Sequence, residues 1–239
     1  MTEFPPDWVH PASLEVARRA QEEIAARVLE EDRPVGQGPA RHVAGVDCSG
    51  APRGTPDVVR AMAVLLDRAG ARNRPAATGL AEGVPSFPYV PGFLAFREVP
   101  FVLEAVAKLP RLPELVFVDG HGVSHPRSCG IASHLGVLLD VPTIGVAKSV
   151  LVGQPQGLLG DARGDWAPLV WKGRRIGAVL RTKVGVQPVY VSVGHRVTLE
   201  AAIRHVLDWG GGYRLPEPTR LADQLAGEAR RAAMSGRLL

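Results

Sequence analysis

Apolar residues recur with a helical period near the start of the chain. They are Ala17, Ala20, Ile24 and Val28. Positions three and four apart share one face of a helix, so this spacing predicts an amphipathic helix over residues 13–32, with Glu, Arg and Gln on its other face. Ser13 is the expected N-cap, because its hydroxyl can accept a hydrogen bond from the first turn, and Pro34 and Gly36 are expected to follow the helix end.

Short apolar runs further along the chain predict the strands of a sheet. The expected strands cover residues 42–50, 58–67, 114–120, 142–148 and 188–197, and a hairpin turn is expected within 171–182. The first two runs are joined by a Gly- and Pro-containing turn, which indicates an antiparallel pair. Residues 69–86 show little periodicity and are expected to form a loop, with a further strand as the alternative.

Four further segments show helical spacing of their apolar residues. They cover residues 97–109, 129–140, 198–209 and 218–234. Antiparallel strands come first along the chain and strand–helix–strand units follow, which predicts an α/β fold with a mixed sheet and helices on both faces. The chain has 239 residues, 46% of them hydrophobic, and contains no internal repeat or long linker. One domain spanning residues 1–239 is therefore expected.

Composition narrows the class of protein only modestly. The net charge is +4, which is compatible with a polyanionic partner but also occurs in proteins that never contact nucleic acid. Cys48 and Cys129 are the only cysteines, so both are expected to be free thiols in a reducing compartment. The N-terminus lacks the features of a signal peptide, and no apolar run approaches the ~18 residues of a spanning helix. A cytoplasmic monomer without a membrane partner is expected.

Two aspartates stand where buried strands end. Asp47 interrupts the apolar run that begins VAGV, and Asp119 closes the run LVFV. A carboxylate in such a place is costly to desolvate unless it is paired or binds a cation. For each acid alone a structural role is an equal alternative, because Asp-Gly suits turns and a carboxylate can accept nearby N–H groups.

The two aspartates together make a stronger argument than either alone. On neighbouring strands of one sheet their carboxylates would lie side by side, and a divalent cation between them would relieve their repulsion. Oxygen ligands favour Mg²⁺ or Mn²⁺, and a pair of such ions is a known solution for phosphodiester cleavage.

The segment over residues 87–98 holds four aromatic residues in a chain that is only 5% aromatic. Pro88 and Pro91 lie on either side of Tyr89 and stiffen its backbone. A rigid turn of this kind can present an aromatic ring as a wedge into a base stack. The alternative is a proline-rich turn whose rings fill a core. Glu98 begins or lies within the following helix and could reach the same metal as the two aspartates.

Several blocks of the chain resemble the endonuclease V (deoxyinosine 3′ endonuclease) family. They are AGVDCSG, PYVPGFLAFRE, VDGHGVSHPRSCGIASHLGVLLDVPTIGVAKS and RTKVGVQPVYVSVGHRVTLEAA, which cover roughly residues 42–206 in family order. The resemblance implies a ribonuclease H-like core and a dependence on Mg²⁺, with Mn²⁺ as a substitute. It also implies cleavage of the second phosphodiester 3′ to an inosine, leaving a 3′-hydroxyl and a 5′-phosphate, in DNA repair or in the processing of inosine-containing RNA.

The resemblance also assigns roles to particular residues of this chain. It makes metal ligands of Asp47, Glu98 and Asp119, with Asp223 in the block PEPTRLADQLA as the matching fourth position. An exposed helical aspartate near Arg220 is the alternative for this fourth residue. The strand-separating wedge corresponds to Pro88, Tyr89, Val90 and Pro91, and the base pocket to backbone groups of Gly92 and Leu94. Polar positions near the scissile phosphate correspond to Arg97, His125 and Lys148.

Two residues depart from the family pattern without touching a metal position. His121 stands where many relatives have an uncharged polar residue, and Cys48 replaces an aliphatic one. His121, His125 and Cys129 recur every four residues, which raises the alternative of a zinc site. Glycines and a proline between them prevent a helix from aligning the three side chains, and no fourth ligand is evident, so zinc is not expected.

Other functions are compatible with parts of this pattern. Another ribonuclease H-like nuclease acting on structured or hybrid nucleic acid would share the acids but not the wedge. A binding module without catalysis would not need the acids, and an enzyme acting on small phosphates would not need the wedge. For an inosine enzyme, N–H donors of the turn over 92–94 would pair with the O6 oxygen of hypoxanthine, where adenine carries an amino group. Both DNA and RNA stay open as the partner.

Overall fold

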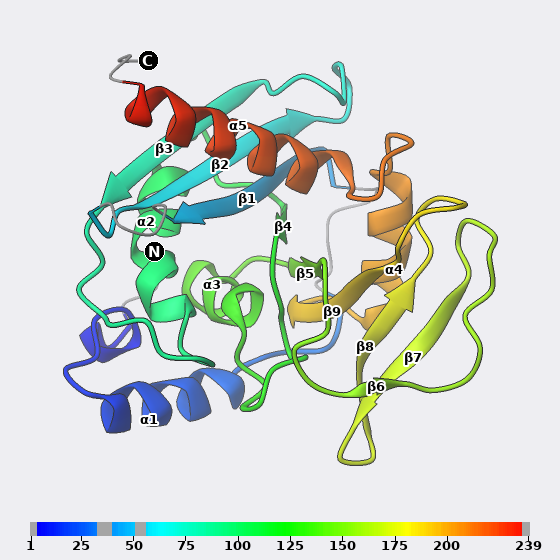
Figure 1. Cartoon of the computed structure of the whole chain (residues 1–239), viewed down its shortest axis with the longest axis horizontal. Coiled ribbons are helices and arrows are strands. Elements are labelled where there is room, and N and C mark those ends of the chain that lie inside the picture. The colour runs from blue at the N-terminus through cyan, green and yellow to red at the C-terminus, as the bar shows by residue number, and fades with distance from the viewer. Residues whose placement is uncertain (1–3, 33–39, 51–55, 236–239) are drawn as a thin grey trace.

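A mixed sheet forms the centre of the computed structural model, which describes residues 4–32, 40–50 and 56–235. Within these residues the sheet has nine strands in the order β3-β2-β1-β4-β5-β9-β8-β7-β6 (Figure 1). The strands are β1 (His42–Gly50), β2 (Val59–Asp67), β3 (Ala77–Gly83), β4 (Leu115–Val118), β5 (Thr143–Ala147), β6 (Gln154–Pro155), β7 (Trp166–Trp171), β8 (Arg174–Leu180) and β9 (Val189–His195). Strand β4 runs parallel to both β1 and β5, and the other neighbours are antiparallel.

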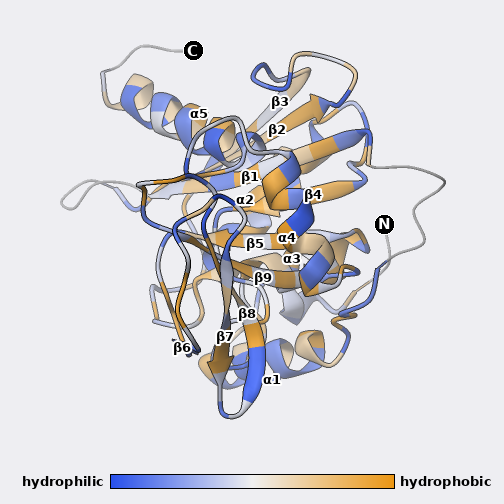
Figure 2. Cartoon of the chain, turned by 90° about the vertical axis from the view of Figure 1, so that its right-hand side faces the viewer, coloured by the Kyte–Doolittle hydropathy of each residue, from blue (hydrophilic) through white to orange (hydrophobic). Residues whose placement is uncertain are grey.

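Helices cover both faces of this sheet, which confirms the expected α/β, ribonuclease H-like class. They are α1 (Leu14–Ala25), α2 (Ala95–Ala107), α3 (Ile131–Leu139), α4 (Leu199–Asp208) and α5 (Glu217–Met234), with a short 3-10 helix η1 (Pro6–Trp8). Helices α2 and α3 pack on one face, and α4 and α5 on the other. Figure 2 shows the mainly apolar strands between these helices, with hydrophilic residues along α5. No helix in the described ranges is long and apolar enough to cross a membrane.

The strands agree with the sequence predictions except at the sheet edges. The stretch over 69–86 contains a strand after all, β3, which pairs with β2 because β2 would otherwise leave its outer edge unpaired. The hairpin expected within 171–182 turns at Lys172 and Gly173, whose φ angles of 50° and 76° suit a tight two-residue turn. Strand β6 was not expected, since its two exposed residues carry no periodic signal.

The first helix begins as predicted but ends earlier. Ser13 caps it, with its Oγ accepting a first-turn backbone N–H at 3.2 Å. The helix stops at Ala25 instead of residue 32 because tertiary contacts take the following backbone groups. The N–H of Leu29 donates to Nδ1 of His195 at 3.3 Å, and its carbonyl accepts the N–H of Arg196 at 2.7 Å.

The sequence analysis assigned Gln21 to the wrong face of this helix. Gln21 was expected on the polar face, but it is completely buried. Position 21 lies between the apolar positions Ala20 and Ile24, so the spacing itself places it within the buried stripe. Pro34 and Gly36, which were expected to follow the helix, lie outside the described residues.

The register of the central strands sets up the site. Val46 of β1 pairs with Val118 of β4, and the N–H of Asp119 donates to the Val46 carbonyl at 3.1 Å. Asp47, which lies within β1 just after its parallel pairing with β4 ends, is therefore brought beside Asp119, which follows β4. This end of a parallel pair is where α/β sheets commonly place their ligands.

Candidate metal and nucleic-acid site

Three carboxylates come together at the ends of the central strands. Asp47 of β1, Asp119 after β4 and Asp223 of α5 each offer an oxygen, and these oxygens lie within 4.8 Å of one another. Side chains alternate along a strand, so Asp47 faces the same side as Gly45, which touches α5 at Pro218. The side chains of Asp47 and Asp119 are thus directed toward α5, which supplies Asp223. Asp223 is an exposed residue of α5, as the alternative expected, and its carboxylate nevertheless lies beside those of Asp47 and Asp119, so its role as a metal ligand stays a prediction.

Burial and mutual repulsion shape the charge of this cluster. Burial, followed by the negative charge of Asp119, raises the pKa of Asp47 to about 7. Burial also raises the pKa of Asp119, whose side chain is only 10% exposed. Carboxylates held this closely favour a cation between them, and an all-oxygen ligand set suits a hard divalent ion. The residues present therefore fit a metal ion of the kind that the sequence analysis expects.

Lys148 lies between two of these acids. It follows β5, and its Nζ is 2.6 Å from an oxygen of Asp119 and 2.6 Å from an oxygen of Asp223. Burial lowers the pKa of Lys148, but its hydrogen bonds to the two carboxylates outweigh this effect and raise the pKa above its usual value. Arg214 holds the same segment in place by donating to the Lys148 carbonyl at 2.6 Å. Lys148 is thus a charged amine beside the acids, and its contact with the scissile phosphate stays a prediction.

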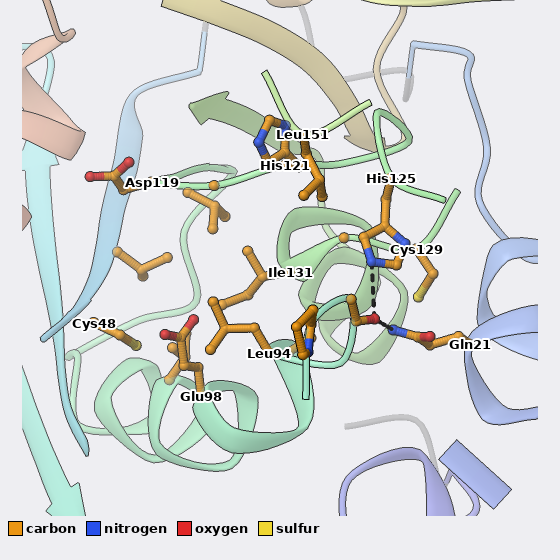
Figure 3. A pocket seen from close by; sticks show the side chains of 18 of the residues that line it. Gln21, Cys48, Leu94, Glu98, Asp119, His121, His125, Cys129, Ile131 and Leu151 are labelled. Carbon is orange, nitrogen blue, oxygen red and sulfur yellow. Dashed lines mark hydrogen bonds between the residues drawn. The ribbon is translucent and has the colours of Figure 1, made fainter. Parts of the chain in front are cut away.

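Glu98 approaches from the other side of the sheet. It lies in the first turn of α2, which packs on the face opposite α5, and Figure 3 shows it beside Cys48 and apart from Asp119. Within the described residues, it is not one of the carboxylates that gather within 4.8 Å of one another. Burial and the charge of Asp47 raise the pKa of Glu98 to about 8. Its role as a metal ligand stays a prediction.

A cavity of about 430 Å³ adjoins the acids (Figure 3). Its walls come from the segment over 89–95, the first turns of α2, the ends of β1 and β4, and the loop over 119–131. Asp47, Glu98, Asp119 and Tyr89 all line it, and Figure 3 shows Glu98 and Asp119 on the side away from His125 and Gln21. Its volume lies in the range of small-molecule pockets, which suits a single extruded base better than a duplex.

The aromatic segment divides into a buried part and an exposed residue. Phe87, Phe93 and Phe96 form a cluster with ring centroids 5.4–6.4 Å apart, and all three are buried. Tyr89 is 69% exposed at the rim of the pocket. Three rings thus fill a core, as the structural alternative expected, and they fix the turn that presents the fourth. This placement of Tyr89 is the one that a wedge requires.

The turn beneath Tyr89 leaves backbone donors free. Phe93 donates its N–H to the carbonyl of Val90 at 3.0 Å, and Gly92 has a φ of 79°, which favours glycine. Among the described residues, the N–H groups of Gly92 and Leu94 donate to no other group. Both residues line the pocket, so two donors are available to a ligand there.

His125 is a neutral side chain that holds this turn. Its Nδ1 accepts the N–H of Arg127 at 3.3 Å, so the proton belongs on Nε2, which lies 3.1 Å from the Gly92 carbonyl oxygen. Burial, and next the charge of Arg127, lowers the pKa of His125 to about 4. A contact between His125 and the scissile phosphate stays a prediction.

Arg97 has structural partners that the sequence did not indicate. It is buried, donates through Nη1 to the Phe87 carbonyl at 2.7 Å, and pairs through Nη2 with Asp57 at 2.7 Å. Arg97 is not among the residues that line the pocket. These contacts anchor the start of the aromatic segment, and they give the predicted phosphate contact less support.

The histidines and cysteine considered for zinc have separate environments. His121 lies 3.0 Å from the Ser124 hydroxyl, and burial lowers its pKa to about 4. His125 is directed at the Gly92 carbonyl, and Cys129 is completely buried. Burial raises the pKa of the Cys129 thiol to about 12, which disfavours the thiolate that zinc requires.

Comparison with known proteins shows the family to which the chain belongs. The sequence profile of endonuclease V matches residues 22–224. The chain belongs to the endonuclease V family. It is therefore an endonuclease, a hydrolase of phosphodiester bonds, as the resemblance in the sequence implied. An endonuclease V from Rhodospirillum centenum is 53% identical over 237 residues, which are 99% of this chain and 96% of the relative.

Solved structures of endonuclease V share this fold. The enzyme from Streptomyces avermitilis superimposes with a TM-score of 0.84 at 46% identity, covering 97% of this chain and 98% of that one. The catalytic domain of the human enzyme has a TM-score of 0.84 at 36% identity, covering 93% and 97%. An endonuclease V from Ciona intestinalis, with a TM-score of 0.77 at 26% identity, covering 92% and 98%, was solved with a 23mer DNA containing an inosine.

Some residues of the site were not found in the sequence. Gln21 and Arg127 contact the turn over 90–94, and Arg214 holds the Lys148 segment. Burial of Gln21 could have been inferred from its place in the apolar stripe. Arg127 carried a signal only as part of the block DGHGVSHPR, and Arg214 carried none, because its partners are backbone carbonyls remote in sequence.

Proposed function

We propose that this endonuclease recognises inosine in nucleic acid and hydrolyses the second phosphodiester 3′ to it, leaving a 3′-hydroxyl and a 5′-phosphate. The observation that carries the proposal is the acidic triad beside a pocket whose rim exposes Tyr89. The inosine-containing DNA bound by the Ciona intestinalis relative supports the choice of base. Residues 1–239 would act as one catalytic domain, and the cytoplasmic location and monomeric state stay predictions.

Recognition of the base would depend on the free backbone donors of the turn. Hypoxanthine carries an oxygen at the position where adenine carries an amino group, so the N–H groups of Gly92 and Leu94 pair with the first and not with the second. Inosine pairs weakly within a duplex, which lowers the cost of extruding it. Tyr89, with Pro88, Val90 and Pro91 around it, would fill the gap that the extruded base leaves.

The cation would be Mg²⁺, with Mn²⁺ as a substitute, held by Asp47, Asp119 and Asp223. Glu98 would contribute from the opposite face of the sheet. When bound, such ions activate water and stabilise the leaving oxygen of a phosphodiester. The three aspartates offer only oxygen ligands, and their negative charges repel one another. Both features support Mg²⁺ or Mn²⁺ over zinc as the bound ion.

The remaining residues would orient the strand and balance its charge. Lys148 is bonded to Asp119 and Asp223 and lies at the position from which an ammonium could offset negative charge on non-bridging phosphate oxygens. His125 is neutral above about pH 4, so it would act as a hydrogen-bonding group and not as a cation. Glu98 and Asp119 lie across the pocket from His125 and Gln21 (Figure 3), so base recognition and bond cleavage would be displaced along the strand.

Cleavage assays on matched strands test this proposal. DNA and RNA oligonucleotides that differ only in carrying inosine or adenine at one position are incubated with the protein and Mg²⁺. We expect the inosine strands to be cut at the second phosphodiester on the 3′ side of the inosine. The adenine strands should stay intact, and chelation of the metal should abolish the activity. Cutting of undamaged hybrids or junctions at the same rate would favour another ribonuclease H-like nuclease. The ratio of rates on DNA and RNA identifies the preferred substrate.

A further inference from the structure

Gln21 is a buried polar residue with both ends of its side chain engaged at the pocket. It lies in α1, is completely buried and lines the cavity. Its Nε2 donates to the Gly92 carbonyl at 3.0 Å, and its Oε1 accepts from Nε of Arg127 at 2.5 Å. A buried amide is costly unless both its groups are hydrogen-bonded, and here both bonds go to the segments that form the pocket.

The Gly92 carbonyl is held by three side chains. It accepts from Nε2 of Gln21 at 3.0 Å, from Nε2 of His125 at 3.1 Å and from Nη2 of Arg127 at 2.7 Å. Figure 3 shows the bonds from Gln21 and His125 converging on this one oxygen. A carbonyl has two lone pairs, so three donors saturate it and fix the plane of its peptide.

Arg127 links Gln21 to the Gly92 carbonyl. Its guanidinium donates to Gln21 and to Gly92 at the same time, and it lies 4.2 Å from the centre of the Phe93 ring. The planar guanidinium presents donors in a fixed fork, so it can make both bonds while stacking on the ring. A lysine at this position would keep the charge but could not make all three contacts together.

We propose that Gln21 and Arg127 are positioning residues that set the selectivity of the base pocket. Because these residues saturate the Gly92 carbonyl, the turn can present only N–H donors to the base. The site therefore accepts a purine with an oxygen at position 6 and rejects one with an amino group there. Without Gln21 the Arg127 guanidinium also loses the acceptor that holds it, so the Gly92 carbonyl keeps one fixed donor, His125. The carbonyl can then accept from an amino group, and discrimination against adenine falls. This inference rests on the proposed function.

The test compares two affinities for Gln21→Leu. Competition binding in a Ca²⁺ buffer measures the affinity for strands that carry inosine or adenine at the same position. We expect the ratio of the two affinities to fall by about three- to tenfold, the size expected for about one net hydrogen bond. The kcat on saturating inosine strands should stay within about twofold, because the acids are untouched, whereas KM should rise.

Two further variants separate selectivity from folding. Arg127→Lys retains the charge and should lower the inosine-to-adenine ratio in the same direction, which decides the matter if Gln21→Leu does not fold. Glu23→Ala is the matched control, because Glu23 lies in the same helix, accepts from Nε1 of Trp8 at 2.9 Å and is not among the residues that line the cavity. It should leave the ratio unchanged.

The possible results of these experiments distinguish a failure of the positioning role from a failure of the proposed inosine activity. Folded Gln21→Leu and Arg127→Lys proteins with the wild-type ratio would overturn the positioning role while leaving the inosine activity intact. A wild-type protein without preference for inosine would overturn the proposed function, and the selectivity role with it. A fall in melting temperature alone, with an unchanged ratio, would show that Gln21 serves only to pack α1.

Discussion

At the scale of single residues, the site depends on a few side chains whose surroundings oppose their ordinary behaviour. Asp47 is an acid with a pKa of about 7, and His125 is an imidazole with a pKa of about 4. Tyr89 is a large aromatic residue exposed beside a core of phenylalanines. Perturbed titratable groups and exposed aromatic rings of this kind are commonly found where a protein binds a ligand.

Replacing Asp47 or Asp119 with Ala should abolish cleavage while leaving the protein folded. We propose that each carboxylate holds the cation and contributes little to the core, so we expect a loss of at least about 100-fold in rate with inosine binding retained, measured by single-turnover cleavage and by binding assays. Asp161→Ala is the control, since Asp161 is a carboxylate that is 98% exposed. Insoluble protein, or full activity in either variant, would contradict the assignment.

Tyr89→Ala should weaken binding to inosine duplexes without destabilising the fold. Stacking on a base is worth ~1–3 kcal/mol, so affinity should fall about ten- to a hundredfold, and less on single strands, where no partner base must be parted. Tyr89→Phe should bind almost as the wild type, because the proposed wedge needs the ring and not the hydroxyl. A buried aromatic would behave in the opposite way, with truncation costing ~3–5 kcal/mol of stability. Melting temperature and duplex affinity, measured on the same variant, distinguish the two roles.

At the scale of elements, helix α5 completes the acidic site by how closely it approaches the sheet. Figure 1 shows α5 lying along β1 and β2. The approach is possible because Gly45 of β1 has no side chain where the backbone of Pro218 passes. Asp223, one turn further along the helix, is thereby brought to Asp47 and Asp119. The spacing between a strand and a helix thus determines whether three acids form one site.

Gly45→Ala should therefore displace α5 and weaken the metal site. Its Cβ would overlap the Pro218 carbonyl, and overpacking of this kind costs about 1–3 kcal/mol, or roughly 2–12 °C in melting temperature for a chain of this size. Metal affinity, followed by calorimetric titration with Mn²⁺, should fall as well. Gly50→Ala is the matched control, because a Cβ at that end of β1 meets nothing within 4 Å. Equal behaviour of the two variants would refute the role given to this contact.

At the scale of the whole molecule, the buried titratable groups make stability depend on pH. Asp47 and Glu98 have pKa values raised to about 7 and about 8, from 3.8 and 4.5. Between these limits the folded protein binds more protons than the unfolded chain, so the unfolding free energy falls as pH rises. His121, His125 and His134 act in the opposite direction, because their lowered pKa values of about 4 make stability rise with pH up to about 6.5.

The metal-free protein should therefore lose stability between pH 6.5 and pH 8.5, where the two carboxyl groups ionise and the opposing contribution of the histidines is smaller, because in the unfolded chain they are already at least half deprotonated. We expect a loss on the order of 2 kcal/mol, or about 4–8 °C in melting temperature, measured by calorimetry in the presence of chelator. Saturating Mg²⁺ should remove this fall, because it binds the ionised carboxylates. Glu98→Gln should flatten the metal-free profile. A metal-free profile that rises over this range would contradict the electrostatics of the site.

The sequence by itself determined the local features of this protein. It predicted the strands that carry Asp47 and Asp119, the N-cap at Ser13 and the hairpin turn in 171–182. It also gave the family, through blocks long enough to be distinctive. These features depend on spacing within a few residues of the chain, which periodicity, capping and turn chemistry report directly.

Only the tertiary structure decided how remote segments meet. The sequence could not show that Glu98 comes from the face of the sheet opposite Asp223, or that Arg97 pairs with Asp57. Gln21 reaches Gly92 across 71 positions and Arg127 across 106. Contacts of this kind are set by strand order, register and the closeness of packed helices, which no local spacing encodes. The acidic cluster and the hydrogen bonds that hold the Gly92 carbonyl are therefore properties of the folded chain.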